Sequence, residues 1–369
     1  MDKKFQLREA FDKLGVIKLA QRIKKVYPNF NDERFTESIN SEIDKLNFGA
    51  RQELIIFNLE KFLPKEFTKS AGILIDSLEH ELEKTELTGF QGIITVPVTK
   101  YIARHGLKNF ELSMKALYEM TKRFSSEEAI RTFIRNFPEE TLKKLHEWTN
   151  DKNPHVRRLV SEGTRPRLPL CSPLTEFKKN PLHVIELLDK LKDDKILLVR
   201  RSVANNMNDI SKDNPDVAID VLRRWGIDAN KETIWIINHA LRTLFKRGNK
   251  DALELLGYLK PDGIISDLSL KKDKLRLGDN LYFSFKLESY IQQKLMIDYA
   301  IHFMKSNGKK SWKVFKLSRK MAEKDEKLFL SKKHSFREMT TRRHYSGEHI
   351  LEIIINGYRF DKKSFFLCF

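Results

Sequence analysis

A short segment of the chain combines four arginines with a single carboxylate, Glu162. The helix-breaking residues Gly163, Pro166 and Pro169 follow the acid closely. Guanidinium groups at this density suit the phosphates of a polyanion such as DNA, and an ionised carboxylate among them can face a positive centre on the bound molecule. The segment therefore predicts an enzyme that acts on nucleic acid rather than a simple DNA clamp. The four arginines are Arg157, Arg158, Arg165 and Arg167.

The overall charge agrees with an anionic partner. The 369 residues include 69 Lys+Arg against 51 Asp+Glu, which gives a formal net charge of +18. Such a surplus favours nucleic acid first and an acidic membrane surface second. The alternative is a generally lysine-rich composition, but the clustering of the arginines argues against it. A hydrophobic content of 40%, with 25 phenylalanines, excludes a mostly disordered chain.

The cysteines and the N-terminal segment indicate which cofactors and which cellular location to expect. The two cysteines, Cys171 and Cys368, lie too far apart in sequence for a Cys-x-x-Cys metal pair or a disulfide framework. We expect no metal and no organic cofactor. The first residues lack the apolar core of a signal peptide, and no apolar run approaches membrane-spanning length. We therefore expect a cytoplasmic protein without a membrane partner, associated with the nucleoid through DNA binding.

The first 260 residues have apolar side chains at helical spacing almost throughout. The motif Val156-Arg157-Arg158 returns 43 residues later as Val199-Arg200-Arg201, and a looser third copy surrounds Trp235. A period near 43 is typical of HEAT and armadillo repeats, in which each helix pair buries its apolar face against its neighbours. We expect an all-α HEAT-like solenoid over residues 1–260. Arg200 and Arg201 are then candidates for phosphate contacts on its concave face.

Residues 261–369 show a different pattern. Leu281, Phe283, Phe285 and Leu287 alternate with polar residues, which indicates a strand. Asn307-Gly308 and Asn356-Gly357 are typical of tight hairpin turns. Some seven strand-like segments in this region predict a small all-β sandwich of immunoglobulin type. The chain is therefore expected to be multidomain, with the helical solenoid followed by the sandwich.

The predicted sandwich carries much of the positive charge. From Asp262 onward, Lys and Arg number 23 and Asp and Glu 13. We expect this domain to contact nucleic acid as well, with a merely soluble lysine-rich surface as the alternative. The pair Arg342-Arg343 either binds DNA or contributes only to the charge of the solvent-exposed surface.

Three long segments resemble a known family. His155–Pro169, Arg123–Arg131 and Asn205–Ser211 are similar to the signature segments of the AlkC branch of HEAT-like-repeat DNA glycosylases. The resemblance covers roughly residues 1–260, and the basic sandwich looks like the immunoglobulin-like appendage of one subgroup. It implies a monofunctional glycosylase that acts as a monomer on double-stranded DNA containing alkylated bases.

The implied reaction is the release of N3-methylated bases such as 3-methyladenine and 3-methylcytosine. These bases are cationic, so the leaving group needs little help from a general acid. Positive charge develops on the deoxyribose as the N-glycosidic bond stretches, as in sugar hydrolysis. A fixed carboxylate can stabilise that charge and orient or deprotonate the attacking water. The product would be an abasic site, without strand cleavage.

The resemblance also assigns roles to individual residues. Glu162 matches the principal catalytic carboxylate, Glu127 its partner at the lesion, and Asp209 a third acidic position on the next repeat. Glu128 would point away from Glu127 on a helix and is expected to be solvated. Asp209 could equally cap a helix or loop.

One position departs from the family pattern. Leu170 stands where the family usually has a Trp, so a stacking contact with the lesion or sugar is lost or comes from another ring. Trp148 and Trp235 are the available rings, although each fits repeat core better. His155 and His239 are expected to pack or cap. A non-catalytic HEAT-type DNA-binding or scaffold protein is the alternative to the enzyme.

Overall fold

The computed structural model describes residues 6–82, 92–338 and 343–369, and Arg342, a predicted DNA contact, lies outside these residues. The chain forms two compact units, 1–240 and 241–369, whereas the sequence suggested a boundary at 260/261. The reason lies in the last two helices, which pack with the strands. The guanidinium of Arg319 lies 5.5 Å from the centre of the Phe245 ring, and Lys250 Nζ lies 4.3 Å from the centre of the Tyr358 ring.

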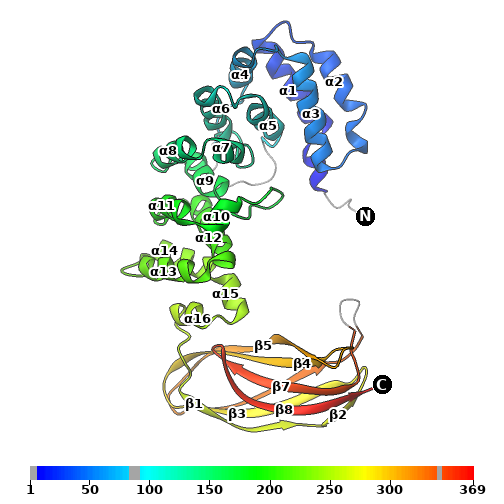
Figure 1. Cartoon of the computed structure of the whole chain (residues 1–369), viewed down its shortest axis with the longest axis vertical. Coiled ribbons are helices and arrows are strands. Elements are labelled where there is room, and N and C mark those ends of the chain that lie inside the picture. Colours follow the sequence, from blue (N-terminus) through cyan, green and yellow to red (C-terminus); the bar gives the residue numbers. More distant parts are fainter. Residues whose placement is uncertain (1–5, 83–91, 339–342) are drawn as a thin grey trace. The chain divides into compact units, whose positions relative to one another are not determined.

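The described part of the first unit contains helices and no strands, as predicted. In Figure 1 its helices follow one another as a stack of antiparallel pairs. The elements are η1 (Leu7–Ala10), α1 (Lys13–Val26), α2 (Asp32–Asn40), η2 (Ile43–Lys45), α3 (Phe48–Phe62), α4 (Phe67–Asp76), α5 (Thr95–His105), α6 (Phe110–Thr121), α7 (Ile130–Asn136), α8 (Pro138–Trp148), α9 (Pro154–Gly163), α10 (Thr175–Lys179), α11 (Leu182–Leu191), α12 (Leu197–Asp213), α13 (Pro215–Trp225) and α14 (Lys231–Ala240).

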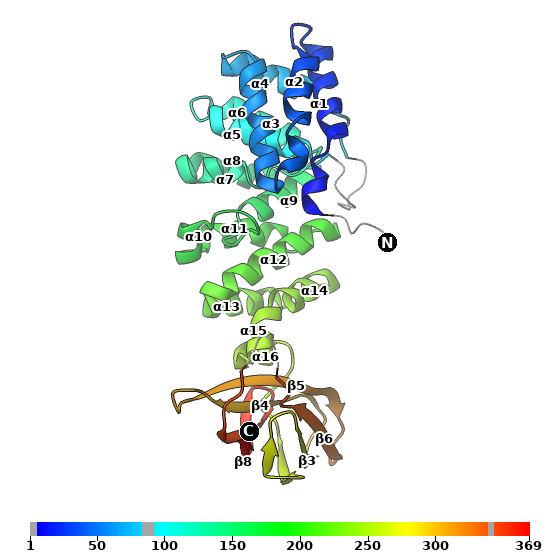
Figure 2. The same ribbon diagram turned by 90° about the vertical axis from the view of Figure 1, so that its right-hand side faces the viewer.

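The predicted repeat is present as the pairs α8/α9, α11/α12 and α13/α14, which follow one another along the unit (Figures 1 and 2). Arg157 on α9 donates from Nη1 to the carbonyls of Asp151 and Lys152. One repeat later, Arg200 on α12 makes the same two bonds to the turn before its own helix. The first arginine of each Val-Arg-Arg motif therefore fastens the turn between the two helices of its repeat.

One helix begins several residues after two serines that could cap it. Ser125 and Ser126 are of a residue type that often caps a helix N-terminus, but α7 begins only at Ile130. The hydroxyl of Ser126 donates to the carbonyl of Leu117, and its N–H donates to Thr121 Oγ1. These bonds tie the segment to α6 and leave residues 127–129 as a turn.

The second unit begins with two short helices and continues as a β-sandwich, which confirms the predicted fold class. Its elements are α15 (Arg242–Arg247), α16 (Lys250–Leu255), β1 (Gly263–Leu270), β2 (Lys274–Arg276), β3 (Asn280–Ser289), β4 (Gln293–Met304), β5 (Lys310–Ala322), β6 (Lys327–Ser335), β7 (Gly347–Ile355) and β8 (Tyr358–Cys368). One sheet has the order β1-β3-β6 and the other β2-β8-β7-β4-β5. Only the short β2–β8 pair is parallel among the described pairings.

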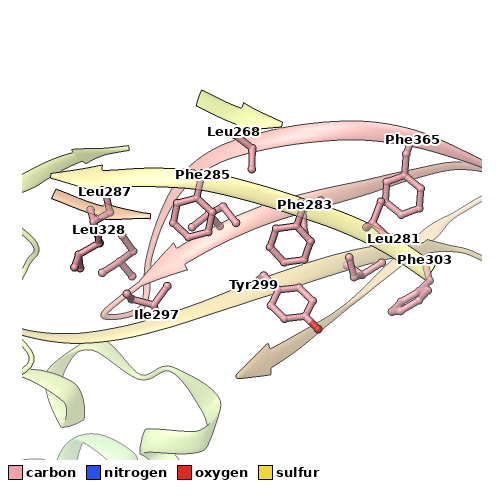
Figure 3. Packing of buried hydrophobic residues seen from close by; sticks show 14 of the residues in the cluster. Leu268, Leu281, Phe283, Phe285, Leu287, Ile297, Tyr299, Phe303, Leu328 and Phe365 are labelled. Carbon is pink, nitrogen blue, oxygen red and sulfur yellow. The ribbon is translucent and has the colours of Figure 1, made fainter. Parts of the chain in front are cut away.

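The core of the sandwich comes from the alternation seen in the sequence. Leu281, Phe283, Phe285 and Leu287 all point inward from β3 and are at most 3% exposed (Figure 3). Asn356 and Gly357 have φ angles of 47° and 78° and connect β7 to β8, so this predicted tight turn is confirmed.

Candidate active site

The three predicted acids and two of the predicted arginines form one continuous chain of alternating charge. Arg158 Nη1 lies 2.9 Å from Glu127 Oε2, and its Nη2 lies 3.9 Å from Glu162 Oε1. Arg165 continues the chain, with Nη1 2.6 Å from Glu162 Oε1 and Nε 2.8 Å from Asp209 Oδ2. The sequence places these groups on three separate segments, and the fold brings them together.

Three elements position this charge chain. Arg158 and Glu162 lie four residues apart on α9 and therefore on one face of it. Glu127 lies in the turn before α7, and Asp209 lies on α12. Gly163 permits the close approach of α9 to α7, because a Cβ at this position would lie 2.5 Å from Ile130 Cγ2.

The Glu162 side chain is buried, and both of its carboxylate oxygens accept hydrogen bonds. Its side chain is 7% exposed. Oε1 accepts from Arg165, and Oε2 accepts from the Ser202 hydroxyl at 2.6 Å. Burial by itself would raise the pKa of Glu162, but the charges of Arg158 and Arg165 and the hydrogen bond from Ser202 hold that pKa below its usual value. Glu162 is thus an anion at neutral pH in a fixed orientation.

The other two acids differ in their accessibility. The Glu127 side chain is 29% exposed, and its Oε2 accepts from the Ser125 hydroxyl at 2.7 Å. The Asp209 side chain is 1% exposed and also accepts from Lys212 at 2.7 Å. Glu127 is therefore the acid that solvent and a bound molecule reach most easily. Glu128 lies outside the charge chain and pairs with Lys100 at 3.0 Å.

A buried arginine that the sequence reasoning missed supports the loop after α9. Arg131 is 1% exposed and donates to the carbonyls of Gly163, Arg165 and Ser172 at 2.7 to 3.0 Å. Burial lowers its pKa to about 10, so it is still a cation at neutral pH. The only sequence signal was its place next to the apolar Ile130 at the start of α7.

Most of the other predicted arginines have partners within the protein. Arg157 pairs with Asp194 of the next repeat, with Nε 2.5 Å from Oδ2. Arg167 binds Asp213 through two bonds but is 40% exposed. Contacts of Arg157, Arg167 or Arg200 with DNA phosphates remain a prediction.

Two predicted arginines are more accessible. Arg201 is exposed, and the described part of the chain offers it no carboxylate within 4.0 Å. Arg343 is exposed too and lies over the ring of Tyr345 at 5.9 Å. Both side chains are accessible to a phosphate group.

The residue at the divergent family position projects outward. Leu170 is 81% exposed and has a φ of 63°, which is unusual for a branched side chain. Trp148 is repeat core, as expected, at 9% exposure. Trp235 is 36% exposed and stacks on His239 at 5.0 Å, so it is not fully buried core.

The described residues offer neither a metal-binding cluster nor a membrane-spanning helix. No cluster of three or more His, Cys, Asp or Glu side chains is arranged there to hold a metal ion. In the same residues, no helix combines the length and the apolarity needed to cross a bilayer.

Comparisons with known proteins cover both units. Residues 264–368 match the family described as "Uncharacterised protein YhaZ, C-terminal Ig-like domain", which confirms the immunoglobulin-like sandwich. An uncharacterized Bacillus subtilis (strain 168) protein, YhaZ, is 37% identical over 98% of this chain and 99% of its own length. The Pseudomonas fluorescens alkylpurine DNA glycosylase AlkC, solved bound to DNA containing an abasic site analog, is 34% identical with a TM-score of 0.79. That likeness covers 99% of both chains.

Proposed function

Since the chain belongs to the AlkC family of alkylpurine DNA glycosylases that carry an immunoglobulin-like domain, we propose that it excises N3-methylated bases from alkylated double-stranded DNA. The substrates are cationic bases such as 3-methyladenine and 3-methylcytosine, and the product is an abasic site. The observation that carries the proposal is the charge chain from Glu127 to Asp209, which holds an ionised Glu162 at its centre.

In the proposed reaction, the leaving base needs little acid catalysis from the protein. A base methylated at N3 is already positively charged, so it departs as a neutral molecule. The bond electrons leave with the base, and the deoxyribose becomes oxocarbenium-like. A carboxylate near C1′ stabilises this charge, and water then adds to C1′ and loses its proton.

The three acids have different roles in this reaction, according to their accessibility. Glu127, as the exposed acid, approaches the sugar and takes the proton of the attacking water. Glu162 is the fixed anion behind it, because burial makes its field stronger than it would be in water. Asp209 fixes Arg165 and so prevents that cation from turning away from Glu162.

We assign the predicted arginines outside the charge chain, and the second unit, to DNA binding. We assign catalysis to the helical solenoid of residues 1–240, and binding of the flanking duplex to the unit of residues 241–369, which contains the basic sandwich. Arg201, Arg343 and the exposed part of Arg167 contact phosphates, whereas Arg157 and Arg200 hold the turns of their own repeats. The protein acts as a monomer on DNA in the cytoplasm.

The test is base release from DNA treated with a methylating agent, with each freed base identified by chromatography and mass spectrometry. The proposal expects free 3-methyladenine or 3-methylcytosine and strand breaks that appear only after alkali, as an abasic product requires. No released base at enzyme in excess over lesions would instead favour a non-catalytic DNA-binding scaffold.

A further inference from the structure

The outer face of the three-stranded sheet carries a groove of about 600 Å³. Figures 1 and 2 show the strands concerned, with β1 beside β3 in the one and β3 beside β6 in the other. Three serines form its floor, one from each strand: Ser269, Ser284 and Ser331. We call this feature the serine groove.

The floor is a row of small hydroxyl side chains across the sheet. Ser269 pairs with Ser284, which in turn pairs with Ser331. The Oγ atoms of Ser269 and Ser284 lie 3.0 Å apart. A hydroxyl both donates and accepts hydrogen bonds, so this row can bond to the polar edge of a flat ring whatever its pattern.

Aromatic rings border the floor on its two sides. Tyr282 lies two residues before Ser284 on β3 and is 45% exposed. Phe329 lies two residues before Ser331 on β6 and is 70% exposed. Because β3 and β6 are antiparallel, these two rings stand on opposite sides of the serine row and face solvent with it.

Lysines surround the rings. Lys271 Nζ lies 5.7 Å from the centre of the Tyr282 ring, and Lys333 is the cross-strand partner of Tyr282. Both are exposed, and no carboxylate of the described residues lies within 4.0 Å of either. Lys286, beside Phe329, already pairs with Asp267. The Tyr282 side of the groove therefore carries uncompensated positive charge.

We propose that the serine groove binds single-stranded DNA, with bases stacked on Tyr282 and Phe329 and phosphates on Lys271 and Lys333. Exposed rings set in a basic groove are the arrangement by which proteins hold unpaired strands without sequence preference. A duplex keeps its base faces stacked inside and cannot use the rings. An acidic peptide satisfies the lysines but offers no flat ring for Tyr282 and Phe329. This site is separate from the proposed excision and does not depend on it.

The test measures binding of a fluorescent oligothymidylate to the full chain by anisotropy, with no damaged base present. The double variant Y282A/F329A should bind at least tenfold more weakly, since each stacked base contributes substantially to affinity. Both side chains are exposed, so the variant is expected to fold. The matched control W312A removes a ring that is 51% exposed on the other sheet and should leave the affinity unchanged. Undamaged duplex of the same length should bind both variants as it binds the unaltered protein.

A second readout separates this groove from any contact that the solenoid makes. Photocrosslinking with 5-iodouracil in the oligonucleotide, followed by peptide mapping, should label the peptides that contain Tyr282 or Phe329. Unchanged affinity in Y282A/F329A, an equal loss in W312A, tighter binding of an RNA of the same sequence, equal competition by polyglutamate, or crosslinks confined to residues 1–240 would each overturn the proposal. Absence of base release would leave these results unaffected.

Discussion

The hydroxyl of Ser202 lies 2.6 Å from Oε2 of Glu162, although the two residues belong to consecutive repeats. Arg165 occupies the other carboxylate oxygen. The carboxylate is therefore held from two helical repeats at once. Its position is a property of the repeat packing and not of one helix alone.

Replacing Ser202 by Ala should raise the pKa of Glu162, because the serine hydrogen bond is one of the causes that lower it. The acid limb of the pH profile for single-turnover base release should then move to higher pH. Unfolding free energy should fall by roughly 1–3 kcal/mol, as for a lost bond to a buried charge. Ser211→Ala on the same helix is the control, since its hydroxyl bonds to the Asn208 carbonyl and not to Glu162. An identical profile in both variants would contradict this role.

The two neighbouring acids before α7 should behave differently. Glu127→Gln should slow base release by roughly 10²-fold or more, because the amide cannot accept the proton of the attacking water. Glu128→Gln should leave the rate within experimental error, because Glu128 pairs with Lys100 outside the charge chain. Single-turnover kinetics at saturating enzyme measure both. Equal slowing of the two variants would show that Glu127 has no special part.

Gly163→Ala should destabilise the solenoid by about 1–3 kcal/mol, since the added Cβ overpacks the contact between α9 and Ile130. Urea unfolding followed by circular dichroism measures the change. The matched control is Gly72→Ala on α4, where an added Cβ meets nothing within 4 Å. That variant should instead gain up to about 1 kcal/mol from helix propensity. A stabilised Gly163→Ala protein would refute the close approach.

The sandwich should lose stability as the pH falls through about 6.5, the usual pKa of an unfolded histidine. Burial lowers the pKa of His349, with a smaller opposing effect from its bond to the Gly347 carbonyl and further lowering by His344 and Lys310. The unfolded state therefore binds the proton first, and stability is full above that pH and falls below it. Urea unfolding of the full chain at several pH values, compared with His349→Phe, measures the effect. The variant should show a smaller slope, and an unchanged slope would assign the dependence to other groups.

Local patterns were sufficient to predict much of this molecule. The 43-residue return of Val-Arg-Arg corresponds to successive helix pairs, and the alternation from Leu281 to Leu287 corresponds to the inward face of β3. The Asn356-Gly357 turn followed from the positive φ angles that such a pair tolerates. These features depend on neighbours within a few residues, so the sequence contains them directly.

Features that depend on distant partners could not be predicted. The pairing of Arg157 with Asp194 and the burial of Arg131 among three carbonyls are set by how repeats stack. The late start of α7 has the same cause, because Ser126 bonds back to α6 rather than capping its own helix. Composition marked these residues as basic or polar but gave no sign of their partners.

The most direct measurement of the central claim is the single-turnover rate of 3-methyladenine release by Glu162→Gln, together with its affinity for lesion-containing duplex. Gln keeps the shape of the side chain and removes the charge that Arg158 and Arg165 hold in place. The rate should fall by roughly 10²-fold or more while the affinity stays nearly unchanged. A Glu162→Gln protein that is folded, binds DNA and releases the base at the original rate would contradict the account.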